Sequence, residues 1–262
     1  MLEGVDKLAG SVGKTIETVP DIYDDALKPT TQESGKILAL IPRTISAALV
    51  PLRQWIANKE YNLAETEKLL AQKLEHVNED KIVTPEPYVA VPAIQAISYS
   101  MNSKELRNLY ANLLAKAMNA DTKESVHPSF VEIIKQLSPV DSLVFKTIME
   151  RTANPLIDLI YENDKYESYI ISTNISDINV SSEEIVSISI DNLIRQSLIS
   201  IPDDSFYTNE HAYDSIINSE YYKTQQIAHP NTLDGFRFAP QKRIINKTNL
   251  GAAFYKICVL DQ

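Results

Sequence analysis

The chain has 262 residues, of which 44% are hydrophobic and 23% are charged, and its formal net charge is -10. This length and composition can fill one large core or two moderate ones, and they exclude wholesale disorder, a collagen-like chain and a disulfide-based fold. Thirty-five acids against 25 bases are the wrong balance for a general nucleic-acid binder. Six glycines, against roughly eighteen at average usage, disfavour folds that cradle phosphates on glycine loops.

The first 139 residues predict a polar arm followed by helices. Residues 1–34 are polar and contain two prolines, so they favour a loosely packed arm. Apolar residues then recur at helical spacing over 45–56 and over 60–77. Ser103 is a suitable N-cap for the strongest helical pattern, over 104–119. Shorter helices are predicted over 92–99, over 129–137, and from a cap at Asp141 to about Arg151.

The pattern changes near residue 154. The stretch 155–180 is rich in Ile and Tyr, lacks a clear helical period, and is typical of strands. The elements predicted after it are a helix from Ser181 or Ser182 through Leu198, a strand over 198–202, an irregular polar insertion over 203–241, a strand over 243–246, and a last helix capped by Thr248.

This order of elements is the outline of a winged helix, a helix-turn-helix variant with a β-hairpin wing. We therefore predict a mainly α protein with a helical domain over 35–139. A smaller α+β winged-helix-like domain over 140–262 follows, with the insertion at 203–241.

No motif for catalysis, metal binding or cofactor binding stands out. The four histidines have no metal-ligand spacing, and His127, which precedes a proline, is expected to serve a turn. The single cysteine, Cys258, excludes an intramolecular disulfide, favours a reducing compartment, and is expected to be a buried structural thiol. Phosphate-loop and nucleophile-elbow motifs are absent. We predict no catalytic residue, cofactor, metal or small-molecule substrate, and a protein that is not an enzyme.

Nucleic-acid binding by the winged helix is disfavoured by charge. The candidate recognition region, 181–200, carries Glu183, Glu184 and Asp191 against Arg195 alone, and a negative helix is repelled by phosphates. A basic wing end is the argument in favour, formed by Lys242, Arg243 and Lys247. A winged-helix nucleic-acid-binding regulator therefore remains the alternative to a protein-contact role.

The segment 34–59 is the one anomaly of charge. It has no acid, and its candidate interaction residues are Lys36, Arg43, Arg53, Trp55 and Lys59. It is compatible with an ordinary core helix pair, with a basic amphipathic helix on an anionic membrane surface, or with a helix presented to an acidic protein partner, another copy included. Its longest apolar stretch is shorter than the roughly 20 residues of a membrane span. A cytoplasmic protein is expected, with peripheral contact at the inner face of the membrane as an option.

Several strings of the sequence carry a family resemblance. They are GKILALIPRTISAALVPLRQWI (35–56), LYANLLAKAMNADTKESVHPSFVEIIKQLSPVD (109–141), NLIRQSL (192–198) and TNLGAAFYKIC (248–258). Together they resemble the abortive infection alpha (Abi-alpha) family over about residues 35–260. The resemblance implies a bacterial or phage-borne protein of phage defence, and it implies no catalytic residue set.

These observations lead to one functional expectation. We expect a non-enzymatic phage-defence protein that acts through protein–protein contact, self-association or membrane-surface contact, with residues 35–60 at its centre.

Overall fold

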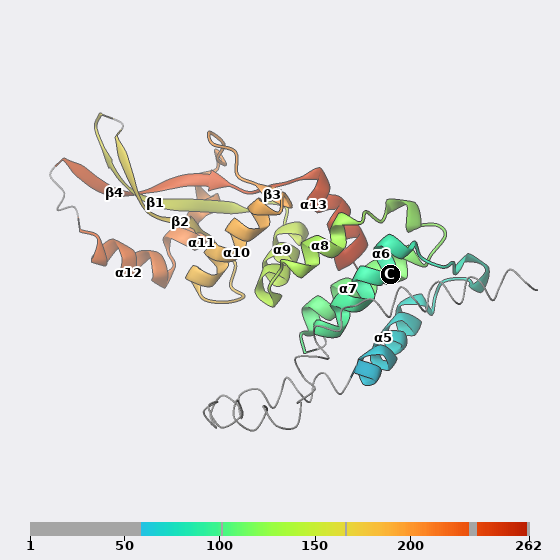
Figure 1. Cartoon of the computed structure of the whole chain (residues 1–262). Coiled ribbons are helices and arrows are strands. Elements are labelled where there is room, and N and C mark those ends of the chain that lie inside the picture. The colour runs from blue at the N-terminus through green and yellow to red at the C-terminus, as the bar shows by residue number, and fades with distance from the viewer. Residues whose placement is uncertain (1–58, 101, 166, 231–234, 261–262) are drawn as a thin grey trace, which may run out of the picture. The chain divides into compact units, whose positions relative to one another are not determined.

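The computed structural model describes residues 59–100, 102–165, 167–230 and 235–260. The described residues from 60 onward belong to one compact unit. Its N-terminal half consists of helices: α5 (Lys59–Leu74), η1 (Glu79–Lys81), α6 (Pro87–Tyr99), α7 (Lys104–Ala117), η2 (Lys123–Ser125), α8 (Ser129–Lys135) and α9 (Pro139–Glu150). The rest mixes strands and helices: β1 (Pro155–Asn163), β2 (Ser168–Ile175), α10 (Glu183–Arg195), β3 (Ile199–Ser200), η3 (Glu210–Tyr213), α11 (Asp214–Ile217), α12 (Glu220–Ala228), β4 (Phe236–Ile244), β5 (Asn246–Lys247), α13 (Asn249–Phe254) and the π-helical η4 (Tyr255–Val259) (Figure 1).

Helix boundaries follow local capping chemistry. The predicted N-caps at Ser103 and Thr248 are confirmed, because their side chains accept hydrogen bonds from the backbone N–H groups of Leu106 and Gly251. The prediction that Asp141 caps the next helix is wrong, since α9 begins at Pro139. There Ser138 is the N-cap, and Asp141 completes a capping box with it.

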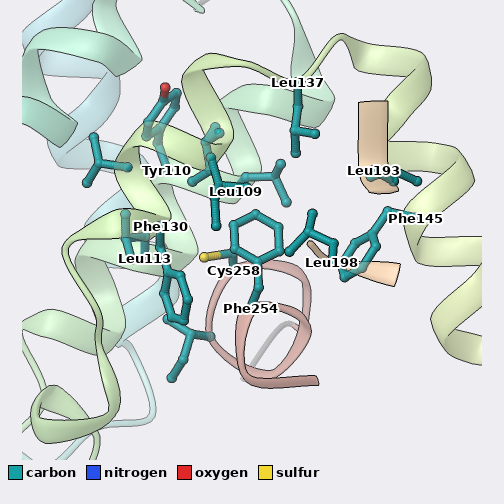
Figure 2. Packing of buried hydrophobic residues seen from close by; sticks show 14 of the residues in the cluster. Leu109, Tyr110, Leu113, Phe130, Leu137, Phe145, Leu193, Leu198, Phe254 and Cys258 are labelled. Carbon is teal, nitrogen blue, oxygen red and sulfur yellow. The ribbon is translucent and has the colours of Figure 1, made fainter. Parts of the chain in front are cut away.

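The main core joins helices from both halves of the described chain. Phe254 of α13 lies edge-on to Phe130 of α8 and Phe145 of α9, with ring centroids 5.5 and 5.6 Å apart. Figure 2 shows Phe254 and Cys258 packed among side chains of α7, α8 and α9. This one cluster includes residues on both sides of the expected boundary at 139/140, and the domain division remains a prediction.

The prediction of a winged helix is wrong. The long strands form a three-stranded antiparallel sheet in the order β2-β1-β4, whereas β3 and β5 form a separate two-stranded sheet. The strands predicted for the wing, 198–202 and 243–246, form only the two-residue pair β3–β5, because Arg243 and Ile244 belong to β4 and pair with β1. The strands β1 and β2 contribute buried apolar residues to a second core. The fold class expected from the sequence, mainly α with a winged-helix domain, is therefore corrected to helices combined with two small antiparallel sheets.

The segment 203–241 is also more regular than expected. It contains η3, α11, α12 and the first six of the nine residues of β4. The reason is tertiary packing, because Tyr213, Ile216 and Tyr222 bury themselves against Ile157 and Leu159 of β1. Short helices of this kind are stabilised by the sheet that they cover rather than by their own propensity.

Candidate interaction surface

Most of the candidate interaction residues of the segment 34–59 lie outside the described residues. Lys36, Arg43, Arg53 and Trp55 belong to that part of the chain. Lys59 is the first residue of α5. The expected role of this segment stays a prediction.

The three predicted wing cations have partners inside the fold. Lys242 of β4 has its Nζ 5.4 Å from the centroid of the Tyr213 ring. Lys247 of β5 donates from Nζ to the backbone carbonyls of Met149 and Arg151, both at 2.8 Å, where α9 ends. These two cations connect strands to neighbouring elements. The nucleic-acid alternative assumed a winged helix, which the described residues do not form.

Arg243 belongs to a buried polar cluster. Its Nη1 donates to Oδ2 of Asp158 at 3.1 Å, and the exposed fractions of the two side chains are 18% and 7%. Its Nη2 lies 3.7 Å from Oδ1 of Asp203. The pair links β4 to β1 on the face of the sheet opposite Ile157 and Leu159, because successive side chains of a strand alternate between faces.

The same cluster holds an irregular end of β2. Between Ile175 and Ile170 the register to β1 shifts twice, and β2 has one extra residue in each interval. Asn174 lies there with φ of 61°, a left-handed conformation that asparagine tolerates better than most residues. Its N–H donates to Asp158 Oδ1 at 2.9 Å, and its side-chain amide donates to Asp191 of α10 at 2.6 Å. The polar cluster therefore fastens the C-terminal end of β2 to both β1 and α10.

The N-terminal half of β2 is different, because it is an open edge. Among the described strands β2 pairs with β1 alone, and from Ser168 to Ile170 its register to β1 is regular. Tyr169 and Ile170 are 62% and 66% exposed. The sequence of the strand, SYIISTNI, contains no charged residue and no proline, which are devices that commonly protect sheet edges. We call residues 168–171 the β2 edge.

Helix α10 borders this edge at its irregular end. Ser187 donates from Oγ to the carbonyl of Thr173 at 2.9 Å. Ile188, the next residue, and Ile185 are exposed apolar side chains of the same helix. An open cavity of about 310 Å³ lies between the strands and α10, with Ile170 and Ile194 among its lining residues. Exposed apolar surface thus occurs on both of these neighbouring elements.

Acidic groups gather near the same irregular end. Burial raises the pKa of Tyr221 in α12, and the carboxylates of Glu184 and Glu183 raise it further, whereas its hydrogen bond to the Ser172 side chain lowers it. Glu183 Oε1 accepts from the N–H of Ser176, the residue directly after β2, at 2.8 Å. With Asp191, Glu183 and its neighbour Glu184 make the C-terminal end of β2, beyond the β2 edge, acidic.

The thiol of Cys258 and the imidazole of His127 both have structural roles. The prediction of a buried Cys258 is confirmed, and burial raises the pKa of its thiol well above the ordinary value. The turn role of His127 is confirmed too, because its Nδ1 accepts from the backbone N–H of Ser129 at 3.1 Å. Within the described ranges, His, Cys, Asp and Glu form no group of three or more suited to a metal ion.

The β2 edge was missed by the sequence-based reasoning. The sequence shows only that 168–175 has no charge and no proline, and the longer run 87–103 is also free of charge, so this feature alone does not mark an edge. A second exposed apolar face lies on α6, where Tyr88, Val91 and Ile94 are exposed. The β2 edge differs from that face because it also offers backbone donors and acceptors and has an acidic end.

None of the described helices combines the length and the hydropathy needed to cross a bilayer.

Comparisons with known proteins give one family and one distant structural likeness. No curated protein matches the chain. A solved structure of an uncharacterized protein from the hydrocarbon-degrading marine bacterium Alcanivorax borkumensis SK2 is similar at 11% identity and a TM-score of 0.36, over 50% of this chain and 92% of that one. That likeness is too small to carry an argument. The family described as abortive infection alpha matches residues 58–258. Since this match spans most of the chain, the protein belongs to the abortive infection alpha family.

Proposed function

We propose that this protein takes part in abortive infection as a binding protein, and that it acts by protein–protein contact at the β2 edge rather than by catalysis. The family supports the defence role. The open β2 edge is the observation that carries the contact role, because an uncharged, exposed edge strand is a template for pairing with another chain.

The surroundings of the polar side chains support a role without catalysis. Asp158 and Arg243 fasten strands to each other, and Asn174 holds a strained strand end. Cys258 is packed in the core. Each of these groups has a structural task that accounts for its position.

A plating assay tests the contact role. Bacteria that carry the gene are challenged with a phage whose plating the wild-type chain reduces. The Tyr169→Lys/Ile170→Lys variant is expected to lose most of the protection, because charge on an edge strand blocks pairing. The matched control is Ile227→Lys, which changes an apolar residue of α12 that is 81% exposed. Full protection by the edge variant would overturn the proposal.

Membrane-surface contact is the competing mechanism. Flotation with anionic phosphatidylglycerol liposomes compares the wild type with Arg43→Glu/Arg53→Glu, which reverses two charges of the acid-free segment. Protein contact predicts that this variant still protects. Wild-type binding to liposomes, lost together with protection in this variant, would favour the membrane and contradict the proposal.

A further inference from the structure

The β2 edge has a free hydrogen-bonding side of defined length. Its four residues span about 13 Å at roughly 3.3 Å per residue. Three of them have regular partners on β1, since Ser168, Tyr169 and Ile170 lie opposite Glu162, Tyr161 and Ile160, whereas Ile171 lies in the register shift before Ser172. In an extended strand the backbone groups that do not face β1 face outward. We infer that β2 accepts an extended segment of another protein as a fourth strand of the sheet, and that this segment is apolar in its middle and basic at one end. The inference rests on the proposed contact role.

The acidic end of the edge specifies where the basic end of the partner lies. Glu184 is exposed, and Asp191 uses one carboxylate oxygen for Asn174. Asp191 lies at the C-terminal end of β2, and Glu183, the neighbour of Glu184, accepts from the N–H of Ser176 directly after that strand. Antiparallel pairing, which is slightly more stable per residue than parallel pairing, brings the N-terminus of an added strand to that end. The partner is therefore expected to have Lys or Arg before its apolar residues.

The apolar surroundings specify the middle of the partner. Ile170 lines the cavity beside α10 together with Ile194 and Ile201, whereas the other lining residues, Asp158, Thr173, Asn174, Asp191 and Arg243, are polar. An added strand presents every second side chain to that face. Aliphatic or β-branched residues at alternate positions would cover Ile170 and remove its exposed surface from water.

A second copy of this chain fits the edge less well. Antiparallel pairing of two β2 strands would bring the hairpin turn of each copy to the acidic end of the other. That turn carries Asp164 and Glu167 against Lys165, so a net negative turn would meet Glu184 and Asp191. Like charges at such a junction oppose self-pairing, and the occupant is a different polypeptide.

Binding of a defined peptide to the full chain tests the inference. The probe is a fluorescent peptide of about eight residues in which Thr and Val alternate after two N-terminal lysines, and the readout is fluorescence anisotropy. We expect saturable binding to the wild type. Ile170→Lys should weaken it about tenfold or more, which corresponds to about 1.4 kcal/mol. Ile227→Lys should leave it unchanged.

Two further comparisons separate backbone pairing from charge. A probe with N-methylated central amides keeps its side chains but lacks the donors for a ladder, and it should not bind. Glu184→Lys, or a probe with its lysines at the C-terminus, should weaken binding about threefold. Absence of saturable wild-type binding, or equal binding by the N-methylated probe, would overturn strand addition.

The outcomes distinguish this inference from the proposed function. If Ile170→Lys loses the peptide but still protects against phage, strand addition stands and the contact role in defence falls. If the edge variant loses protection and the peptide never binds, the contact role stands and strand addition falls. A wild-type dimer in sedimentation that Ile170→Lys converts to a monomer would identify a second copy as the occupant, and would overturn the inferred partner chemistry.

Discussion

The two edges of the three-stranded sheet are built in opposite ways. β4, at one edge, has the sequence FRFAPQKRI, with a proline and three basic residues. β2, at the other edge, has no charge and no proline. Proline and lysine are common means of preventing edge-to-edge association. One sheet therefore has a protected edge and an open one, and the openness of β2 is a local property rather than a general feature of the fold.

Two of the basic residues of β4 also have partners inside the fold. Arg243 neutralises the buried Asp158, and Lys242 lies against Tyr213. Changes on β4 should therefore act on stability, whereas changes on the β2 edge should act on binding.

The largest effect on stability is expected from Arg243→Ala. It leaves the Asp158 carboxylate, whose side chain is 7% exposed, without its cation. Removing one partner of a buried pair costs about 3–5 kcal/mol. Urea unfolding should show this loss, whereas Lys242→Ala should lose about 0.5–1 kcal/mol through its cation–π contact. Equal small losses in both variants would mean that the β4 cations are surface groups after all.

Asn174→Ala should have an intermediate effect. Alanine loses the hydrogen bond to Asp191 and is strained at a φ of 61°, so a destabilisation of about 2 kcal/mol is expected in urea unfolding. Asn174→Gly also loses the amide but accepts this conformation, and it should be the more stable of the two. The reverse order would show that the irregular end of β2 is not held in the left-handed conformation.

Ile170→Lys should change stability little. The residue is 66% exposed, and substitutions at such positions are expected to stay within about 1 kcal/mol. Thermal or urea unfolding checks this result. A loss as large as that of Arg243→Ala would mean that the residue belongs to the core, and the β2 edge would no longer be a free surface.

The smallest expected effect is on the pH dependence of stability, through the carboxyl group of Glu183. Burial raises the pKa of its carboxyl, although the N–H of Ser176 donates to it and lowers the pKa. A raised pKa means that the folded state holds the proton more tightly, so the stability contribution falls as pH rises through the interval above the ordinary value of 4.5. Glu183→Gln removes this fall, and its stability relative to the wild type should increase from acidic to neutral pH. A relative stability that decreases over this range in urea unfolding would contradict the assignment.

Local signals in the sequence predicted the helices of the helical half, although α6 begins at Pro87 rather than at 92 and α9 is capped by Ser138 rather than by Asp141. The apolar period over 104–119 and the capping residue Ser103 predict α7 because both act within a few residues. The Ile- and Tyr-rich composition of 155–180 likewise indicates strands. These features depend on neighbours in the chain, which a single sequence displays.

The rest depends on partners that lie far apart in the chain. β4 pairs with β1 across an interval that includes η3, α11 and α12. Pro240 within β4 also makes a strand hard to predict there, because proline is uncommon inside strands. The sequence predicts Arg243 to be a surface cation, because its partner Asp158 is 85 residues away in the chain. The β2 edge could be recognised only after the sheet order had shown which strands are at the edges.

Hydrogen exchange at the two edges tests the central claim most directly. The amides of residues 168–171, and those of 237–241 other than Pro240, which has no N–H, are followed in the full chain, alone and with the lysine-led peptide. An open β2 edge predicts that the outward-facing amides of 168–171 exchange readily in the free protein and become protected when the peptide is added, while those of 237–241 do not change. Protection at 237–241, or no new protection at 168–171 at saturating peptide, would contradict the account.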